Sequence, residues 1–334
     1  MALVRANPPY KSIRIWLFVC CGFVFTMVLL GGITRLTESG LSMVYWRPVT
    51  GWLPPTSDSA WASIFDAYRN SPEFVKLNFW MGLEDFKRIF WLEYLHRLLG
   101  RILGIVYLLP LLWFAFRYRL TTRLTVSLGL LFVLGAAQGV LGWYMVKSGL
   151  VEEPSVSHYR LAAHLGLAVM IYGIMLFIAI GLRPGRRKSF RSAYGSSWPA
   201  ALVFTTMIWG AFMAGLDGGS VFNTFPLMDG HFFPPYSLSS SPLVLNLFDN
   251  IGLVQWLHRI LATVTVTVII WIWWRDRANR STALNILGAV ALFQFGLGVL
   301  TILSEAMIFI AWAHQAGAMI LFSAAVWRWR ETRL

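Results

Sequence analysis

The chain has 334 residues, of which 57% are hydrophobic and only 13% are charged, whereas about 25% of the residues are charged in an average soluble domain. This composition excludes a soluble globular protein and, at about 20 apolar residues per bilayer crossing, predicts a polytopic membrane protein. The net charge of +13 does not indicate nucleic-acid binding, because the basic residues lie between apolar segments instead of forming one stripe.

The apolar segments, taken in chain order, predict eight transmembrane helices. They span residues 15–33, 89–116, 124–146, 158–182, 198–216, 251–274, 282–304 and 306–327. The expected fold class is therefore all-α, with little sequence left for a separate soluble domain. The adjacent Cys20 and Cys21 lie inside the first apolar run, which fits neither a disulfide framework nor a four-ligand zinc site.

Basic residues are concentrated in every second connection and near both termini. They lie in residues 5–14, 117–123, 183–191, 275–280 and 328–333. The positive-inside rule therefore predicts that both termini and these short connections are cytoplasmic. No transit peptide rich in Arg and Ser precedes the first apolar run, which favours a bacterial inner membrane. The opposite connections, residues 34–88 and 217–250, are long and aromatic, and we expect them to lie at the outer membrane interface and cover a site.

Short motifs recur in the two halves of the chain. In order, these are EYLHR (93–97), QGVLG (138–142) and His164, then QWLHR (255–259), QFGLG (294–298) and His314. Each half holds an even number of predicted helices, so both halves enter the membrane from the same side. The sequence predicts two pseudo-symmetric four-helix bundles, residues 1–190 and 191–334.

The histidines are the candidate metal ligands. Those inside predicted helices lie roughly six to eight residues after a helix start, on even-numbered helices, and are His96, His164, His258 and His314. At about 1.5 Å per residue they share one expected depth, about 10 Å below the outer surface. A lone helical histidine is often a satisfied core residue, but four imidazoles at one depth in lipid favour a function. Two imidazoles per bundle suit axial ligation of haem iron, whereas zinc needs a third or fourth protein ligand. The remaining two, His158 and His231, lack repeat partners and are expected at an interface and in a loop.

The halves differ three residues before the first histidine of each motif, where the first half has Glu93 and the second has Gln255. A carboxyl group can titrate and an amide only forms hydrogen bonds, so we expect a working haem site in the first half and a holding or electron-relay site in the second. The alternative for Glu93 is an ion pair with Arg97 or Arg101. A further hypothesis is that Arg97 and Arg259 neutralise haem propionates.

Several stretches of the chain carry a resemblance to a known family. They are GGITRLTESGLSMVYW (31–46), PEFVKLNF (72–79), EYLHRLLGRI (93–102), GAAQGVLGWYMVKSGL (135–150), HYRLAAHLGLA (158–168), AGLDGGSVFNTFPLMDG (214–230), QWLHRIL (255–261) and AHQAGAM (313–319). In these stretches the chain resembles the heme A synthases that serve cytochrome oxidase assembly, in their proteobacterial and mitochondrial branch. The resemblance covers both halves in order.

The resemblance implies an oxidoreductase that converts the C8 methyl group of heme O to the formyl group of heme A. It implies that His96 and His164 face the substrate and product haem, that His258 and His314 ligate a bound haem b, and that Glu93 is the essential acid. Some bacterial members carry a cysteine pair in the first outer loop, but residues 34–88 contain no cysteine. Disulfide chemistry is therefore not expected to supply the electrons.

The partners implied are a heme O synthase, cytochrome oxidase assembly factors, an electron donor that stays unidentified and membrane lipid, with a homo-oligomer left open. The main alternative function is a diheme cytochrome b that transfers electrons without altering its haems. Such proteins commonly stack their haems near opposite membrane faces, whereas the four histidines share one expected depth. A transporter would need broken helices near the midplane, and no such pair is evident.

Overall fold

The computed structural model describes residues 9–47, 50–149, 154–182, 197–277 and 281–333, and within these ranges it contains helices and no β-strand. Eight of the helices are long and apolar enough to cross a membrane. They are α1 (Tyr10–Leu36), α3 (Leu83–Arg117), α4 (Thr122–Gly149), α5 (His158–Gly181), α6 (Trp198–Gly215), α8 (Ile251–Arg275), α9 (Thr282–Leu303) and α10 (Ile308–Glu331). The predicted all-α fold with eight spans is confirmed.

The start of α3 differs from the prediction. This helix begins at Leu83, ahead of the apolar run at 89, because its first turns carry charged side chains that hydropathy does not count as helix. Asp85 accepts a hydrogen bond from the backbone N–H of Gly82 and caps the helix. His96 is consequently the fourteenth residue of α3. The expectation that every helical histidine follows its helix start by six to eight residues is therefore wrong for His96.

The described helices form two compact units, Met1–Arg160 and Leu161–Leu334, with the boundary inside α5. The sequence predicted halves of 1–190 and 191–334. The predicted boundary lies outside the described residues, as do the basic residues of 183–191. The division into two pseudo-symmetric four-helix bundles remains a prediction.

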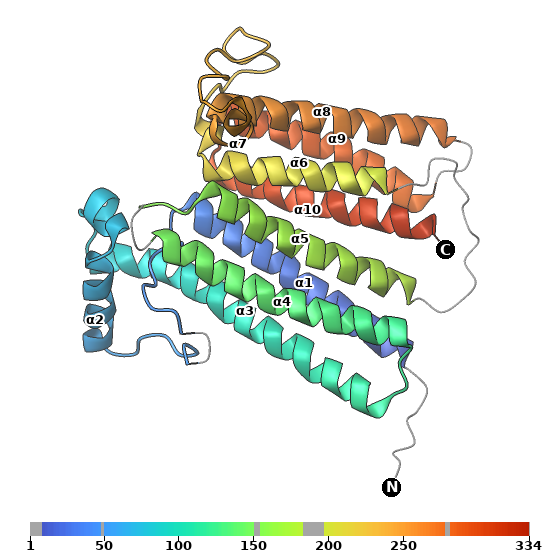
Figure 1. Ribbon diagram of the computed structural model, residues 1–334, viewed down its shortest axis with the longest axis horizontal. Helices are drawn as coiled ribbons and strands as arrows, with labels where there is room; N and C mark the ends of the chain where they lie inside the picture. The colour runs from blue at the N-terminus through green and yellow to red at the C-terminus, as the bar shows by residue number, and fades with distance from the viewer. Residues whose placement is uncertain (1–8, 48–49, 150–153, 183–196, 278–280, 334) are drawn as a thin grey trace. The chain divides into compact units, whose positions relative to one another are not determined.

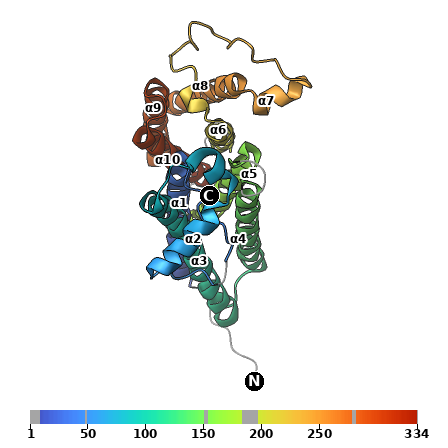
Figure 2. The same ribbon diagram turned by 90° about the vertical axis from the view of Figure 1, so that its left-hand side faces the viewer.

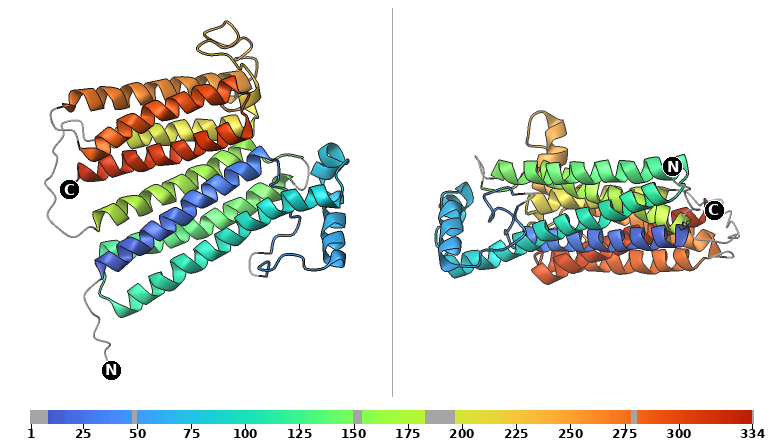
Figure 3. Two further views of the ribbon diagram at one scale, coloured as in Figure 1. Left: turned by 180° about the vertical axis from the view of Figure 1, so that it is seen from behind. Right: turned by 90° about the horizontal axis from the view of Figure 1, so that it is seen from below.

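Unit 1 is built on α3, which packs against both α1 and α4 (Figures 1 and 3). Trp16 of α1 donates its indole N–H to the carbonyl of Val106, and its ring lies 5.0 Å from that of Tyr107. The Tyr107 hydroxyl in turn donates to the carbonyl of Leu128 on α4. These buried aromatic contacts hold α1, α3 and α4 together, and the first connecting segment leads from α1 to α3.

The first connecting segment, residues 37–82, contains α2 (Asp58–Arg69) and a π-helical turn, η1 (Phe74–Asn78). Ser57 caps α2 by accepting from the N–H of Ala60. The helix packs against the N-terminal end of α3 through an aromatic cluster (Figure 1). The buried members of this cluster are Trp61, Tyr68, Phe86, Ile89, Phe90 and Tyr94.

In unit 2, α8 packs against α6 and α9, and α10 packs against α9 and α6 (Figure 2). Residues of α5 from Leu161 onward also belong to this unit, since Ala162 packs with Ala211 and the Tyr172 hydroxyl lies 2.6 Å from that of Ser323 on α10. The second connecting segment, residues 216–250, joins α6 to α8. It contains η2 (Gly218–Ser220), η3 (Leu243–Leu245) and α7 (Asn246–Asp249).

Candidate functional site

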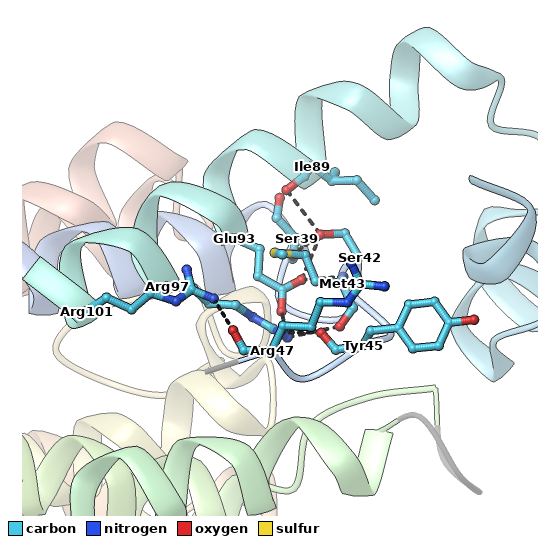
Figure 4. A network of polar contacts seen from close by, with 9 residues as sticks. All are labelled: Ser39, Ser42, Met43, Tyr45, Arg47, Ile89, Glu93, Arg97 and Arg101. Carbon is cyan, nitrogen blue, oxygen red and sulfur yellow. Dashed lines mark hydrogen bonds and ion pairs between the residues drawn. The ribbon is translucent and has the colours of Figure 1, made fainter. Parts of the chain in front are cut away.

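Glu93 is buried on α3, where both carboxylate oxygens are bound (Figure 4). Its Oε2 accepts hydrogen bonds from the Ser42 hydroxyl at 2.7 Å and from the Met43 backbone N–H at 2.8 Å, and its Oε1 pairs with Arg97. The alternative considered from the sequence, an ion pair with Arg97, is therefore present. Arg101 does not take part, because it donates to the Arg47 carbonyl at 2.8 Å.

Arg97 binds the same stretch of the first connecting segment as Glu93 does. Its guanidinium donates to the carbonyls of Met43 at 3.0 Å and Tyr45 at 3.1 Å, and lies 5.1 Å from the centre of the Trp46 ring. Residues 42–47 are thus held against α3 by an acid and two arginines, as Figure 4 shows. The sequence analysis did not foresee this contact, although the polar stretch TRLTESGLSMVYW was its signal. With these donors engaged, the binding of haem propionates by Arg97 remains a prediction.

The corresponding residues of unit 2 make a parallel set of contacts with a neutral amide. Gln255 donates its amide N–H groups to the carbonyls of Gly218 and Val221, and its Oε1 accepts from Arg259 at 3.2 Å. Arg259 also donates to the carbonyls of Phe222 and Thr224. The difference lies in the backbone: the segment offers donors to Glu93 and acceptors to Gln255. In each unit, the hydrogen-bonding groups of the connecting segment therefore complement the side chain that they face, donors for the carboxylate of Glu93 and acceptors for the amide N–H groups of Gln255.

A left-handed backbone turn precedes each of these contacts. Glu38, just after α1, has φ of 52°, and Asp217, just after α6, has φ of 54°. Non-glycine residues adopt this region infrequently, and Asp is among those that tolerate it best. In both units, the connecting segment that follows this turn contacts the helix that bears the EYLHR or QWLHR motif.

A second buried carboxyl group, Glu73, lies in the first connecting segment and is only 4% exposed. It accepts a hydrogen bond from the Tyr68 hydroxyl at 2.9 Å, and Asn78 donates to the same hydroxyl at 2.9 Å. The pKa of Glu73 is raised from 4.5 to about 8, chiefly by burial and also by the charges of Glu93 and Glu38, while the hydrogen bond from Tyr68 opposes the rise. Its motif, PEFVKLNF, predicted no role for this residue.

The two histidines of the predicted first pair lie in different units. His96 is on α3 in unit 1, where Gly31 of α1 leaves space for its ring: a methyl group at Gly31 would lie 3.2 Å from Nε2. His164 is on α5 in unit 2. Their joint ligation of a substrate haem therefore remains a prediction.

The two histidines of the predicted second pair lie together in unit 2. The ring centres of His258 on α8 and His314 on α10 are 6.5 Å apart, with the ring planes at 82°. When two imidazoles ligate one iron, Nε2 of each lies about 2 Å from the metal, which separates the ring centres by roughly 6 to 6.5 Å. The spacing in unit 2 fits this requirement.

Both imidazoles of unit 2 use Nδ1 for a contact inside the protein. Nδ1 of His258 lies 3.1 Å from the Thr206 carbonyl, and Nδ1 of His314 lies 3.0 Å from the amide nitrogen of Gln294. Neither Nε2 forms a hydrogen bond with the described residues. A ligand histidine commonly donates one ring N–H to a protein acceptor and leaves the other nitrogen for the metal. The Thr206 carbonyl is such an acceptor, so the donor chemistry at His258 fits haem. At His314 the partner is the amide nitrogen of Gln294, and the fit requires the amide to present its oxygen to Nδ1 instead.

The two histidines without repeat partners lie at a helix end and in a connecting segment, and the interfacial position of His158 remains a prediction. His158 is the first residue of α5, and its ring lies 4.3 Å from that of Tyr159. His231 is exposed in the second connecting segment, where its backbone pairs with that of Met228. Among the described residues, no three or more His, Cys, Asp or Glu side chains gather as a metal-binding group.

Known proteins are similar to this chain over nearly its full length. The family model of the COX15-CtaA cytochrome oxidase assembly proteins matches residues 14–326. The chain is 46% identical to the heme A synthase of Nitrosospira multiformis, over 97% of this chain and 94% of the relative. It is 44% identical to the heme A synthase of Paramagnetospirillum magneticum, over 96% and 94%. It is also 44% identical to the heme A synthase COX15 of Arabidopsis thaliana, over 96% of this chain and 75% of the plant protein.

The matched region contains all the candidate site residues and six of the eight apolar helices in full, together with most of α1 and of α10. The family match and identities of 44–46% extend over nearly the whole chain and include both units. The chain is a multi-pass membrane protein that belongs to the COX15-CtaA family of cytochrome oxidase assembly proteins.

Proposed function

We propose that this protein is a heme A synthase, an oxidoreductase that converts the C8 methyl group of heme O to a formyl group for cytochrome oxidase. The observation that carries the proposal is the similarity to proteins named heme A synthase across both units, at 46% identity over 97% of the chain. The paired imidazoles of unit 2, at the separation that haem ligation requires, support it independently.

In this proposal, His258 and His314 hold a resident haem b, which supplies electron transfer when bound. His96 and His164 face heme O and its product. Gly210 and Gly298 contribute by leaving room for the rings, since a methyl group on either would lie 3.1 Å from Cε1 of His258 or His314 respectively. The protein positions the haems and excludes alternative ring orientations, while the difficult oxidation is the chemistry of the iron.

Glu93 has two tasks in the proposal. It fixes residues 42–43 against α3 beside the helix turn that carries His96, and it places a carboxylate one turn from that imidazole. Arg97 pairs with this carboxylate, so protonation of Glu93 would weaken the ion pair and, with it, the attachment of residues 42–43 to α3. Proton handling at the substrate is thereby coupled to the position of the first connecting segment.

The location and partners are part of the same proposal. We infer a bacterial inner membrane with both termini cytoplasmic, because the basic residues of alternate connections follow the positive-inside rule. Heme O comes from a heme O synthase, and heme A passes to cytochrome oxidase assembly factors. A separate electron donor is needed, since no cysteine is available in residues 34–88 to exchange electrons.

The test is pigment extraction from membranes that contain this protein together with a heme O synthase. We expect heme A to accumulate and the purified protein to retain haem b with a low-spin spectrum. Haem b alone, with heme O left unconverted, would support the diheme cytochrome b alternative and overturn the proposal.

Variants separate the two haem sites in the same assay. His258→Ala and His314→Ala should lose the resident haem b, whereas His231→Ala, an exposed histidine outside the paired imidazoles, should retain it. Retention of haem b after loss of both paired histidines would show that unit 2 does not hold it. Glu93→Ala should keep haem b but stall the conversion of heme O, and undiminished heme A in that variant would remove Glu93 from the mechanism.

A further inference from the structure

We propose that Gln294 on α9 is a positioning residue that controls whether His314 can ligate iron, so that His258 is the fixed ligand and His314 the adjustable one. This inference rests on the proposed haem b site of unit 2. It assigns different roles to two histidines that the sequence repeat treats as a pair.

The fixed character of His258 follows from its Nδ1 partner. That atom lies 3.1 Å from the backbone carbonyl of Thr206 on α6. A carbonyl oxygen can only accept a hydrogen bond, so the proton of the neutral imidazole is held on Nδ1 and the lone pair stays on Nε2. Since α6 packs against α8, this carbonyl cannot turn away without disturbing the helix. His258 is therefore kept permanently in the ligating tautomer.

His314 faces a partner of a different kind. Nδ1 of this ring lies 3.0 Å from the amide nitrogen of Gln294, which also donates to the backbone carbonyl of His314 at 2.9 Å. When an amide N–H points at Nδ1, that atom acts as the acceptor and the imidazole proton lies on Nε2. In this arrangement the lone pair that iron requires is not on Nε2, so His314 is held in the non-ligating tautomer.

The amide of Gln294 offers a second arrangement. Its Oε1 is buried and has no hydrogen-bond partner in the described structure. Because a buried acceptor without a partner costs free energy, a rotation of the amide that gives Oε1 a hydrogen bond recovers that cost. A half-turn of the amide brings Oε1 to Nδ1, which then donates, and Nε2 of His314 becomes free to ligate. The same turn gives up the hydrogen bond from the amide N–H to the His314 carbonyl, so Oε1 is satisfied at the loss of that bond. The Thr206 carbonyl that faces His258 cannot change from acceptor to donor in this way.

The surroundings of the amide leave space for its oxygen. The closest atom to a methyl group at Gly317, one turn from His314 on α10, would be Oε1 of Gln294, at a distance that no real side chain tolerates. Gly298 leaves the equivalent space beside the imidazole itself. Only the absence of a side chain at 317 lets Gln294 reach the ring.

The experiment compares Gln294→Glu with the wild type as purified haem-containing protein, by redox titration and low-temperature optical and electron paramagnetic resonance spectra of haem b. A carboxylate can only accept from Nδ1–H, so it fixes the ligating tautomer and increases the basicity of the ring. We expect the ratio of ferric to ferrous haem at a given potential to rise at least tenfold, which is a fall of about 59 mV in the midpoint potential. Gln294→Leu removes the partner, and we expect a high-spin fraction to appear.

Gln138→Glu, at the repeat position in unit 1, is the matched control and should leave the potential of haem b unchanged. The inference is overturned if both Gln294 variants keep the wild-type potential and spectrum, if Gln294→Glu loses haem b, or if Gln138→Glu lowers the potential equally. If the proposed haem b site of unit 2 is wrong, the His258→Ala and His314→Ala variants will retain haem b. That result distinguishes an error in the proposed function from an error in the role of Gln294.

Discussion

Replacement of Glu93 by Gln tests the main electrostatic difference between the two units. If the new amide oxygen faces Arg97, its NH₂ group faces Ser42 and Met43. The Ser42 hydroxyl can rotate to accept a hydrogen bond, but the Met43 N–H cannot. One backbone donor is then left without its partner, which costs about 1–3 kcal/mol. Residues 42–47 should consequently open about 5- to 150-fold more often.

The opening is measured by hydrogen–deuterium exchange of the peptide that covers residues 39–47, with the protein in lipid nanodiscs. Residues 218–224 of unit 2 serve as the internal control, because Gln255 holds them and is unchanged in this variant. The reciprocal variant, Gln255→Glu, should accelerate exchange in 218–224 alone, since its carboxylate would face two carbonyl oxygens. Unchanged exchange of residues 39–47 in Glu93→Gln would refute the reasoning that the carboxylate holds this segment.

The remaining predictions concern stability and the haem pocket. Because burial raises the pKa of Glu73 to about 8 from 4.5, the folded state favours its neutral form. Its contribution to stability is fully present below pH 4.5 and is lost, by a few kcal/mol, as pH rises through 8. Hydrogen–deuterium exchange of the peptide that covers residues 61–78, measured in denaturant at each pH, should show this fall, and Glu73→Gln should abolish it; an equal fall in both proteins would contradict the assignment. Gly210→Val should crowd the His258 ring and lower haem b content, measured by pyridine haemochrome, whereas Gly296→Val on α9, where an added methyl group meets nothing within 4 Å, should not.

The sequence alone determined the class of the protein and the position of its helices. Apolar runs of bilayer length admit no other fold, because a spanning segment must satisfy its own backbone hydrogen bonds. The four histidines and the contrast between Glu93 and Gln255 were likewise visible in the order of the residues. Hydropathy placed the start of α3 too late, because its first residues include the charged side chains of Glu84, Asp85, Lys87 and Arg88. It also missed α2, which lies inside the segment expected as a loop.

The tertiary structure alone decided what each side chain touches. Residues 42–47 and 218–224 lie far along the chain from Glu93 and Gln255, and their binding depends on left-handed turns at Glu38 and Asp217 that hydropathy does not register.

The 6.5 Å separation of His258 and His314, and the different partners of their Nδ1 atoms, arise from the packing of α6, α8, α9 and α10. A repeat in sequence specifies which residue types recur. Which atom of each residue meets a donor or an acceptor is fixed by neighbouring helices, because hydrogen bonds form over only about 3 Å and depend on direction.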